Sequence, residues 1–550
     1  MKKGIPSTMN DEWQLNLHKM LEYAAKINST TEVISDRRMQ GGKVHKLNYK
    51  LIYERVCAIT NALEGELDVK EGEIIGILDW NDHRYFESYY SIPSLAAVLL
   101  TLNFRLHPNE ILYIIKHCKA RGLLVDESLL QLAELLSKEY KFDFIIIMSD
   151  KSIDEIKTNL SGRVYGYEEL IKSHPTSRKW EEIDEKTAAI AATTSGTTGM
   201  PKVVLYSHRS ITLHAMAVSK DLRPTDVTMQ VVPMFHATGW GLPFAATISA
   251  CKQVYPGRPT IETLVENLIT HKVTRTAAVP TVLLEILRRL EKMEPKPDLK
   301  GLKINVGGSE PPLSLVTKFA KYNVELQQGY GATETSPLVA FSFSKPELEV
   351  LPLEERFLRM KQGLVTFGVE VRVVDPSSGS DLPFDGRSVG ELWFRGPWVI
   401  KGYYNDPRSL GSVTPDGWWR SGDVGVVDGL GYIRLVDRLK DVVKSGGEWI
   451  SSIDLENFLM THPAVLEACV VGVPHPKWGE RPLAFIVLRQ EYRGKDLEAL
   501  KEELRSHLLK RFAKWQLPDD FIFLDEIPKT SVGKFRKEEL RKKYQNYFTR

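Results

Sequence analysis

A ten-residue stretch at positions 193–202 has the composition of a phosphate-binding loop. It reads Thr-Thr-Ser-Gly-Thr-Thr-Gly-Met-Pro-Lys. Glycines let backbone N–H groups turn toward an anion, because they adopt φ > 0 and carry no Cβ. Successive N–H groups of this kind form an anion-binding nest. The stretch is not a Walker A loop, since Pro201 separates Gly199 from Lys202 and a strand is predicted to follow. We expect a polyphosphate ligand, with a Ser/Thr/Gly-rich surface loop as the alternative.

Five further polar stretches follow along the chain. Positions 233–240 read Pro-Met-Phe-His-Ala-Thr-Gly-Trp, and positions 328–334 read Gln-Gly-Tyr-Gly-Ala-Thr-Glu. Positions 421–423 read Ser-Gly-Asp, positions 437–449 read Asp-Arg-Leu-Lys-Asp-Val-Val-Lys-Ser-Gly-Gly-Glu-Trp, and positions 528–534 read Pro-Lys-Thr-Ser-Val-Gly-Lys. Taken singly, each has an ordinary structural explanation, such as a turn cap for Asp423, a core residue for Trp240 or a basic tail for Lys534.

Short apolar strands alternate with helical segments through the first part of the chain, which is typical of α/β folds with largely parallel sheets. Residues 11–65 are predicted to be helical, and strands are predicted near residues 122–125, 187–192 and 303–306. Such folds place ligands in the loops at the carboxyl ends of parallel strands. The glycine-rich turns at 307–310 and 328–334 each follow a predicted strand, so we expect them to share one pocket.

The pattern becomes all-β from about residue 367, and a compact α+β unit follows. We predict a large N-terminal domain over residues 1–437 and a small C-terminal domain over residues 438–550.

The composition is that of an ordinary globular protein, with 43% hydrophobic and 26% charged residues. A net charge of +2 gives no reason to expect a nucleic-acid partner. The four cysteines are far apart and match neither a disulfide framework nor a zinc site, which favours a reducing, cytoplasmic setting. We expect no signal peptide and no integral membrane segment, because the most apolar stretch, at 89–104, is too short to span a bilayer.

The polar stretches, in this order and at these distances, resemble the signature motifs of the adenylate-forming superfamily. This superfamily comprises acyl-CoA synthetases, peptide-synthetase adenylation domains and firefly-type luciferases. The resemblance covers nearly the whole chain and is greatest to bacterial long-chain fatty acyl-CoA synthetases. It implies a large α/β N-terminal domain, built from layered sheets with helices and a small β-barrel-like part, and a small mobile α+β C-terminal domain. It also implies two steps: a carboxylate attacks the α-phosphorus of Mg-ATP and pyrophosphate leaves, and then the thiol of coenzyme A displaces AMP.

The resemblance implies a set of ATP/AMP-binding residues. Thr194 and Glu334 match the Mg²⁺ ligands, and oxygen donors suit that hard cation. Asp423 would accept hydrogen bonds from the ribose hydroxyls. Val203 departs from the pattern, since the family usually has glycine there. The matching nucleotide-binding positions are Thr194, Ser195, Gly196, Thr197, Thr198, Gly199, Lys202, Gly308, Gln328, Gly329, Tyr330, Thr333, Asp423, Arg438, Lys440, Lys444 and Trp449.

The acid and coenzyme A sides are implied in the same way. His236, Ala237 and Trp240 match the acid entrance, where Trp240 would gate a fatty-acid tunnel. Lys534 matches the catalytic lysine, which neutralises charge in the first transition state, and it acts with His236 and Glu334. Lys440 matches the hinge near 438–441, whose torsions would rotate the small domain. After rotation, Gly446 and Gly447 would let the backbone pass close to the pantetheine arm of coenzyme A.

The leading hypothesis is therefore an ATP-dependent ligase that joins a medium- or long-chain fatty acid to coenzyme A. A short or hydroxylated acid, such as a hydroxybutyrate, is the main alternative substrate. An amino-acid-adenylating enzyme would carry an aspartate within 233–240, which this chain lacks. A luciferase-like enzyme and a non-catalytic nucleotide-binding protein are the remaining alternatives. The resemblance also implies a homodimer, because close relatives pair through the N-terminal region.

Overall fold

The computed structural model describes residues 4–5, 8–9, 12–194, 200–446, 448–529 and 535–549. Three sheets organise these residues: one of seven strands, one path of thirteen strands, and one of five strands near the C-terminus.

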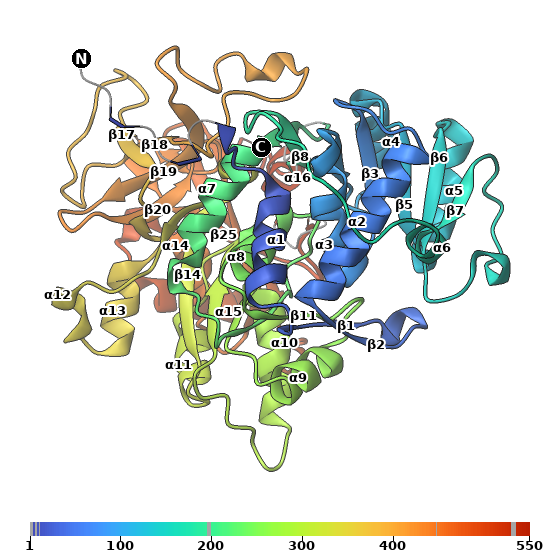
Figure 1. Cartoon of the computed structure of the whole chain (residues 1–550). Coiled ribbons are helices and arrows are strands. Elements are labelled where there is room, and N and C mark those ends of the chain that lie inside the picture. Colours follow the sequence, from blue (N-terminus) through green and yellow to red (C-terminus); the bar gives the residue numbers. More distant parts are fainter. Residues whose placement is uncertain are drawn as a thin grey trace.

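The seven-stranded sheet lies on the right of Figure 1 in blue to green. Its strands are parallel except for the last, which pairs antiparallel with its neighbour. Several are buried along their whole length, as expected for a sheet covered on both faces. In spatial order they are β7 (Val164–Gly166), β6 (Phe144–Met148), β5 (Gly122–Asp126), β3 (Ile74–Leu78), β4 (Val98–Thr101), β8 (Ala188–Thr193) and β9 (Val203–Ser207). Nearby helices are α2 (Tyr49–Gly65), α3 (His83–Ser91), α4 (Pro108–Cys118), α5 (Leu130–Glu139) and α6 (Tyr167–Ser173).

One half of the thirteen-stranded path is mainly parallel. Its strands are β14 (Glu325–Gly331), β13 (Lys303–Val306), β12 (Arg275–Ala278), β10 (Val227–Met229), β11 (Lys252–Tyr255), β1 (Glu32–Asp36) and the antiparallel edge strand β2 (Val44–Asn48). The associated helices are α1 (Leu17–Ile27), α7 (His208–Val218), α8 (Leu242–Ile248), α9 (Ile261–Thr270), α10 (Pro280–Glu291) and α11 (Leu313–Ala320). The core between this half and the seven-stranded sheet contains buried residues of α1, α2, α3, α7 and α8.

The other half is antiparallel and lies at the upper left of Figure 1. It contains β15 (Leu338–Phe341), β16 (Gly363–Val365), β20 (Tyr432–Arg438), β19 (Trp419–Val427), β18 (Gly390–Arg395) and β17 (Glu370–Val374), with α12 (Pro346–Glu349) and α13 (Leu353–Met360) beside them. Strand β14 joins the halves, because Gln328 pairs in parallel with Val306 and Gly329 pairs antiparallel with Phe341. The motif at 328–334 therefore lies at this junction.

The C-terminal sheet has its own hydrophobic core, made of residues from Val443 onward. Its strands are β22 (Glu448–Ile450), β21 (Val443–Ser445), β24 (Gly479–Leu488), β23 (Val465–His475) and β25 (Asp520–Phe523). Its helices are α14 (Ser452–Leu459), α15 (Leu497–Leu509) and α16 (Lys537–Lys543).

One expectation from the sequence is wrong. Residues 11–65 are not one helical region, because β1 and β2 separate α1 from α2. Strand β1 pairs in parallel with β11, with Val33 opposite Gln253, and local periodicity cannot reveal so distant a partner. The predicted change to an all-β pattern near residue 367 is confirmed, since α13 ends at Met360 and the elements from β16 to β22 are strands, apart from the short turn η9 (Pro407–Ser409).

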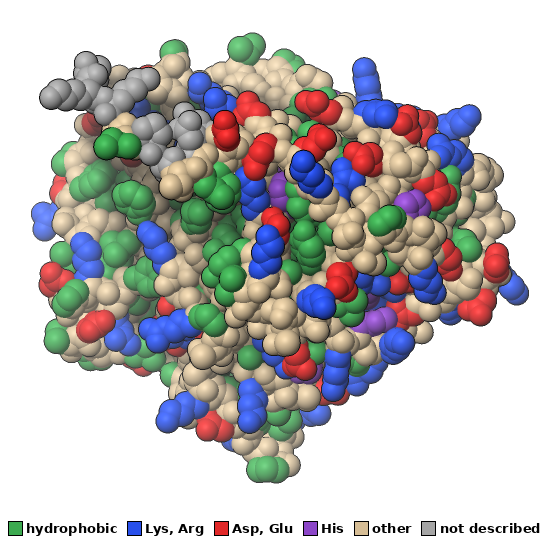
Figure 2. Space-filling view, viewed as in Figure 1, with side chains coloured by type: hydrophobic (Ala, Val, Ile, Leu, Met, Phe, Trp, Pro, Cys, Tyr) green, Lys and Arg blue, Asp and Glu red, His purple; other side chains and the backbone are tan. Residues whose placement is uncertain are grey.

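The surface in Figure 2 carries positive and negative side chains interspersed over the visible face, in keeping with a net charge of +2. Within the described ranges, none of the helices has both the length and the apolar character that a bilayer crossing requires.

Candidate active site

The predicted phosphate loop is the connection of the β8–β9 hairpin. The amide of Thr194 donates to the Lys202 carbonyl at 2.9 Å, and the Lys202 amide donates to Thr194 Oγ1 at 3.4 Å. The two strands predicted to flank the loop are confirmed. Ser195, Gly196, Thr197, Thr198 and Gly199 lie outside the described residues.

Val203, the departure from the family pattern, has a packing explanation. Its side chain is fully buried in the core on one face of the seven-stranded sheet. Its carbonyl accepts a hydrogen bond from the Tyr404 amide at 2.8 Å. The valine therefore anchors the end of the loop in the core, which a glycine could not do.

Lys202 extends from the end of this loop toward Glu334. Its Nζ lies 3.8 Å from the centre of the Tyr403 ring. Burial lowers the pKa of Lys202, and the nearby Glu334 partly offsets that effect. The face of an aromatic ring attracts a cation without neutralising it, so Tyr403 holds the Lys202 ammonium group and leaves its charge in place. Its charge is therefore available to an anion.

Glu334 lies on the short helical turn η8 (Thr333–Thr335) after β14. Its Oε1 accepts a hydrogen bond from the Tyr403 hydroxyl at 2.7 Å, and its carbonyl accepts one from the Ile400 amide at 2.9 Å. Burial, followed by the charge of Glu334, raises the pKa of Tyr403 well above its usual value, so the phenol remains a donor. A carboxylate has a second oxygen, and together with the Thr194 hydroxyl this donor set fits Mg²⁺.

Asp423 on β19 is buried and oriented by two donors. Arg438, opposite it on β20, places Nε 2.6 Å from Oδ1. The Tyr330 hydroxyl donates to Oδ2 at 2.5 Å. A carboxylate offers about four acceptor positions, so two remain for the hydroxyls of a sugar. Tyr330 itself is buried with its ring 5.9 Å from that of Phe394, and burial raises its pKa well above the usual value.

The predicted acid-side residues form an unusual left-handed turn, η7 (Ala237–Gly241). Ala237, Thr238 and Trp240 have φ of +38°, +45° and +57°. Each such residue costs roughly 1–2 kcal/mol. His236 precedes the turn and accepts the Gly239 amide at its carbonyl. The surroundings leave no room for a side chain at Gly241, because an added Cβ would collide with the His214 ring.

Trp240 reaches the end of β13 from this turn. An ideal Cβ on Gly307 would lie 2.8 Å from Trp240 Cη2 and 3.4 Å from the Gly329 carbonyl oxygen. Trp240 thus packs against Gly307, which also lies beside Gly329 on β14. Gly308, the next residue along the chain, has φ of +80°. Gln328 is buried next to Gly329, and its Oε1 has no hydrogen-bond partner.

A cavity of about 240 Å³ adjoins the Trp240 turn. Leu242, which begins α8 directly after the turn, is part of its wall. Most of the lining surface is apolar and comes from α7, β15, β16 and the segments that follow them. Its polar and charged residues include Lys220 and Asp221 after α7, Arg275 and Thr276 on β12, and Asn305 on β13. Representative lining residues are Leu242, Thr276, Asn305, Leu338, Phe341 and Leu364.

The remaining predicted residues follow β20 along the chain. Lys444 and Trp449 face each other across the β21–β22 pair, which joins β24 and not the strands that carry Asp423. Gly446 has φ of +62° at the turn between them. Lys440 lies between β20 and β21 and is exposed. Gly447 and Lys534 lie outside the described residues.

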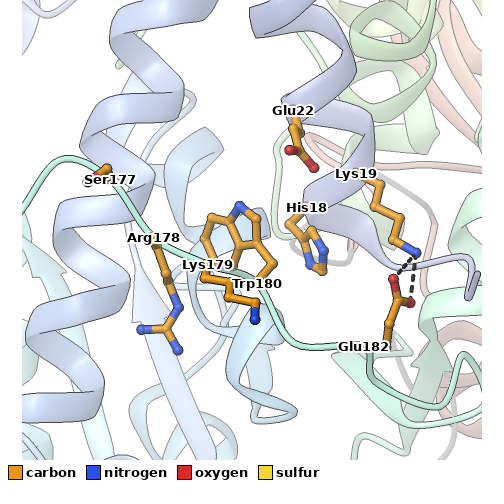
Figure 3. Close-up of a pocket in the computed structure, with 8 residues that line it drawn as sticks. All are labelled: His18, Lys19, Glu22, Ser177, Arg178, Lys179, Trp180 and Glu182. Carbon is orange, nitrogen blue, oxygen red and sulfur yellow. Dashed lines mark hydrogen bonds and ion pairs between the residues drawn. The ribbon is translucent and has the colours of Figure 1, made fainter.

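A wider hollow of about 630 Å³ lies elsewhere, between α1 and residues 177–182 (Figure 3). Lys19, Arg178 and Lys179 are among its lining residues. Lys19 is paired with Glu182 and Arg178 with Glu64, each at 2.7 Å. His18 stacks on Trp180 at 4.9 Å, and burial lowers its pKa to about 3, so it is uncharged near neutral pH. The hollow contains none of the predicted site residues.

Sequence spacing gives no sign of two residues at the site. Tyr403 contacts both Lys202 and Glu334, although it is 69 positions from Glu334. Gly307 was recognisable only as part of a tight turn, and its contact with Trp240 depends on how β13 and η7 pack.

The chain is similar to known proteins along almost its whole length. The AMP-binding enzyme family model matches residues 21–404, and the model of the AMP-binding enzyme C-terminal domain matches residues 454–534. A long-chain-fatty-acid–CoA ligase of Thermus thermophilus is 44% identical over 99% of this chain and 98% of its own length. A medium-chain-fatty-acid–CoA ligase of Ectopseudomonas oleovorans is 34% identical over 96% of both chains. A 3-methylmercaptopropionyl-CoA ligase of Ruegeria lacuscaerulensis is 37% identical over 97% of this chain and 98% of its own.

A solved structure shares the fold. The anthranilate CoA ligase AuaEII, crystallised with anthranoyl-AMP, superposes with a TM-score of 0.83 at 23% identity, over 97% of this chain and 98% of that one. The predicted adenylate-forming fold is thereby confirmed. Both family models match in order and the curated relatives align along almost the whole chain, so this protein belongs to the AMP-binding enzyme family.

Proposed function

We propose that this protein is an ATP-dependent acid–thiol ligase that converts a medium- or long-chain fatty acid to its coenzyme A thioester. The observation that carries the proposal is that Lys202 and Glu334 both contact Tyr403, while Tyr330, in the same motif as Glu334, donates to Asp423. Together Lys202, Glu334 and Asp423 offer a cation for phosphate, a carboxylate for a metal ion and an oriented acceptor for ribose. These are the groups that an adenylation reaction needs.

In the first step a carboxylate oxygen of the acid attacks the α-phosphorus, the bond to pyrophosphate breaks, and an acyl-adenylate forms. Thr194, Lys202 and residues 195–199 hold the β- and γ-phosphates, and Asp423 holds the ribose with Arg438 as its partner. Mg²⁺ bound by Glu334 and Thr194 would supply positive charge against the polyphosphate. Gly308, Gln328, Gly329, Tyr330 and Thr333 frame the adenine and the α-phosphate. His236 orients the acid, and Lys534 neutralises charge at the reacting phosphorus.

In the second step the sulfur of coenzyme A attacks the acyl carbon and AMP leaves. We propose that residues 438–550 rotate about Lys440, which carries Lys444, Gly446, Gly447 and Trp449 to the site in place of Lys534. The separate hydrophobic core of the residues after Val443 supports this division. A homodimer and a cytoplasmic location complete the proposal.

The substrate class is supported by the apolar cavity beside Trp240 and by the relatives named as long- and medium-chain fatty acid ligases. Trp240 and Ala237 would form the entrance between this cavity and the nucleotide. The second candidate is a shorter or polar-substituted acid. It is favoured by Thr276 and Asn305 in the cavity wall and by the relative named as a 3-methylmercaptopropionyl-CoA ligase.

The test is acid-dependent pyrophosphate release across a panel of acids from acetate to octadecanoate, including hydroxy acids, with coenzyme A present. We expect the highest kcat/KM among the medium and long chains, with the acyl-CoA product identified by mass. A maximum at short or hydroxylated acids would transfer the assignment to the second candidate. No acyl-CoA from any member of the panel would refute the ligase assignment.

A further inference from the structure

Residues 396–409, here called the strap, connect the two halves of the nucleotide site. On one side the Ile400 amide donates to the Glu334 carbonyl at 2.9 Å, and Trp398 Nε1 donates to the Leu338 carbonyl at 3.0 Å. The strap therefore fastens the segment that carries the proposed metal ligand.

On the other side the strap fastens the phosphate loop. The Tyr404 amide donates to the Val203 carbonyl at 2.8 Å, and Arg408 Nη1 donates to the Met200 carbonyl at 2.8 Å. Both acceptors lie at the end of the loop that contains Lys202. One short segment thus sets the distance between the loop and Glu334.

Tyr403 occupies the centre of the strap, and its side chain contacts both partners. Its hydroxyl donates to Glu334 Oε1 at 2.7 Å, and its ring centre lies 3.8 Å from Lys202 Nζ. Its backbone is fixed in turn, because its amide donates to Ser409 Oγ at 2.7 Å and its carbonyl accepts from that hydroxyl at 3.1 Å. The side chain is only 8% exposed and packs in the core between the sheets. Its position is therefore determined before any ligand arrives.

We propose that Tyr403 is a positioning residue that presents the Glu334 carboxylate to Mg²⁺ and holds Lys202 toward the phosphates. The proposal deepens the proposed function and rests on it for the identity of the metal and nucleotide. The hydroxyl engages one carboxylate oxygen, which limits rotation of the carboxylate and directs the other oxygen to the metal. The ring supports the lysine without neutralising it, so its charge remains available to ATP.

The hydroxyl and the ring can be separated by substitution. Tyr403→Phe keeps the ring under Lys202 and removes only the hydrogen bond. Tyr403→Leu removes both contacts. Tyr404→Phe is the matched control, since the contacts of Tyr404 with Val203 and His117 use its backbone and its ring.

The experiment measures binding without catalysis, using the full chain and no acid. ATP affinity is determined by calorimetry at a series of Mg²⁺ concentrations, and Mn²⁺ binding to the ATP complex is followed by electron paramagnetic resonance. For Tyr403→Phe we expect the metal to bind roughly 10- to 100-fold more weakly, the range for one charge-assisted hydrogen bond, with metal-free ATP affinity unchanged. Tyr403→Leu should in addition weaken metal-free ATP binding a few-fold.

Coupling to Glu334 provides the decisive comparison. In a Glu334→Gln background, Tyr403→Phe should have no further effect on metal binding, because both changes act through one carboxylate. Equal metal affinity of Tyr403→Phe and the unchanged protein would overturn the proposal, even with a lower melting temperature. Independent effects of the two substitutions would overturn it as well. These readouts need no ligase turnover, so failure of the acid panel and failure of this proposal are distinguishable.

Discussion

A methyl group added at Gly307 tests how tightly the Trp240 ring is held and what it does there. An ideal Cβ would lie 2.8 Å from Cη2 and 3.0 Å from Cζ3 of the indole. Carbon atoms in favourable contact are about 3.5–4.0 Å apart, so the ring must move by roughly 0.7 Å. Gly307 is not among the glycines with positive φ, so alanine fits the backbone and the indole is the main obstacle.

Overpacking of this kind costs about 1–3 kcal/mol. If the cost falls on the turn that admits the acid, kcat/KM decreases by roughly 5- to 150-fold. Leu242, directly after the Trp240 turn, lines the apolar cavity. If Trp240 is the entrance to that cavity, the loss for Gly307→Ala should grow with chain length and be small for acetate. The assay is pyrophosphate release across the acid panel, with the melting temperature measured in parallel.

Trp240→Phe is the compensating change, since a phenyl ring lacks the Cη2 and Cζ3 atoms that meet the new methyl. Gly307→Ala combined with Trp240→Phe should lose less than the product of the two single losses. If Gly307→Ala lowers the melting temperature and leaves the chain-length profile unchanged, Trp240 is a core residue and the reasoning is refuted. Strictly multiplicative losses would show that the two side chains do not collide.

Three other predictions concern the loop, the C-terminal core and the reaction steps. Val203→Gly should lower the free energy of unfolding by about 3 kcal/mol, because it removes buried apolar surface and adds backbone freedom. Val203→Ala should lower it less. Equal denaturation midpoints for Val203→Gly and the unchanged protein would contradict the anchoring role. Burial raises the pKa of Glu456 from 4.5 to about 7, so the folded state binds the proton more tightly and stability falls, by up to roughly 3 kcal/mol, as pH rises through that interval. Glu456→Gln should flatten the pH dependence of the melting temperature between pH 4.5 and about 7. An unaltered slope would contradict the assignment of this pH dependence to Glu456. Lys534→Ala should abolish acid-dependent pyrophosphate release while supplied acyl-adenylate and coenzyme A still react; normal release would remove Lys534 from the first step.

The sequence alone was sufficient for the reaction class and the fold class. A glycine-rich anion-binding loop, a carboxylate motif or a glycine turn is made of residues adjacent in the sequence. The order of these motifs along the chain can therefore be recognised from the sequence alone. The same holds for β8 and β9, whose apolar runs flank the loop, and for the strand that precedes Gly307. These local patterns indicated where the proposed nucleotide-binding motifs lie in an α/β sheet.

Only the tertiary structure decided which side chains meet. The pairing of β1 with β11, the hydrogen bond from Tyr330 to Asp423, and the contact of Trp240 with Gly307 each join residues far apart in the chain. Tyr403 is the clearest case, because it lies in a segment of ordinary composition and acquires its contacts with Glu334 and Lys202 when the strap crosses both loops. Such contacts are set by packing over the whole core, and no local propensity or spacing encodes them.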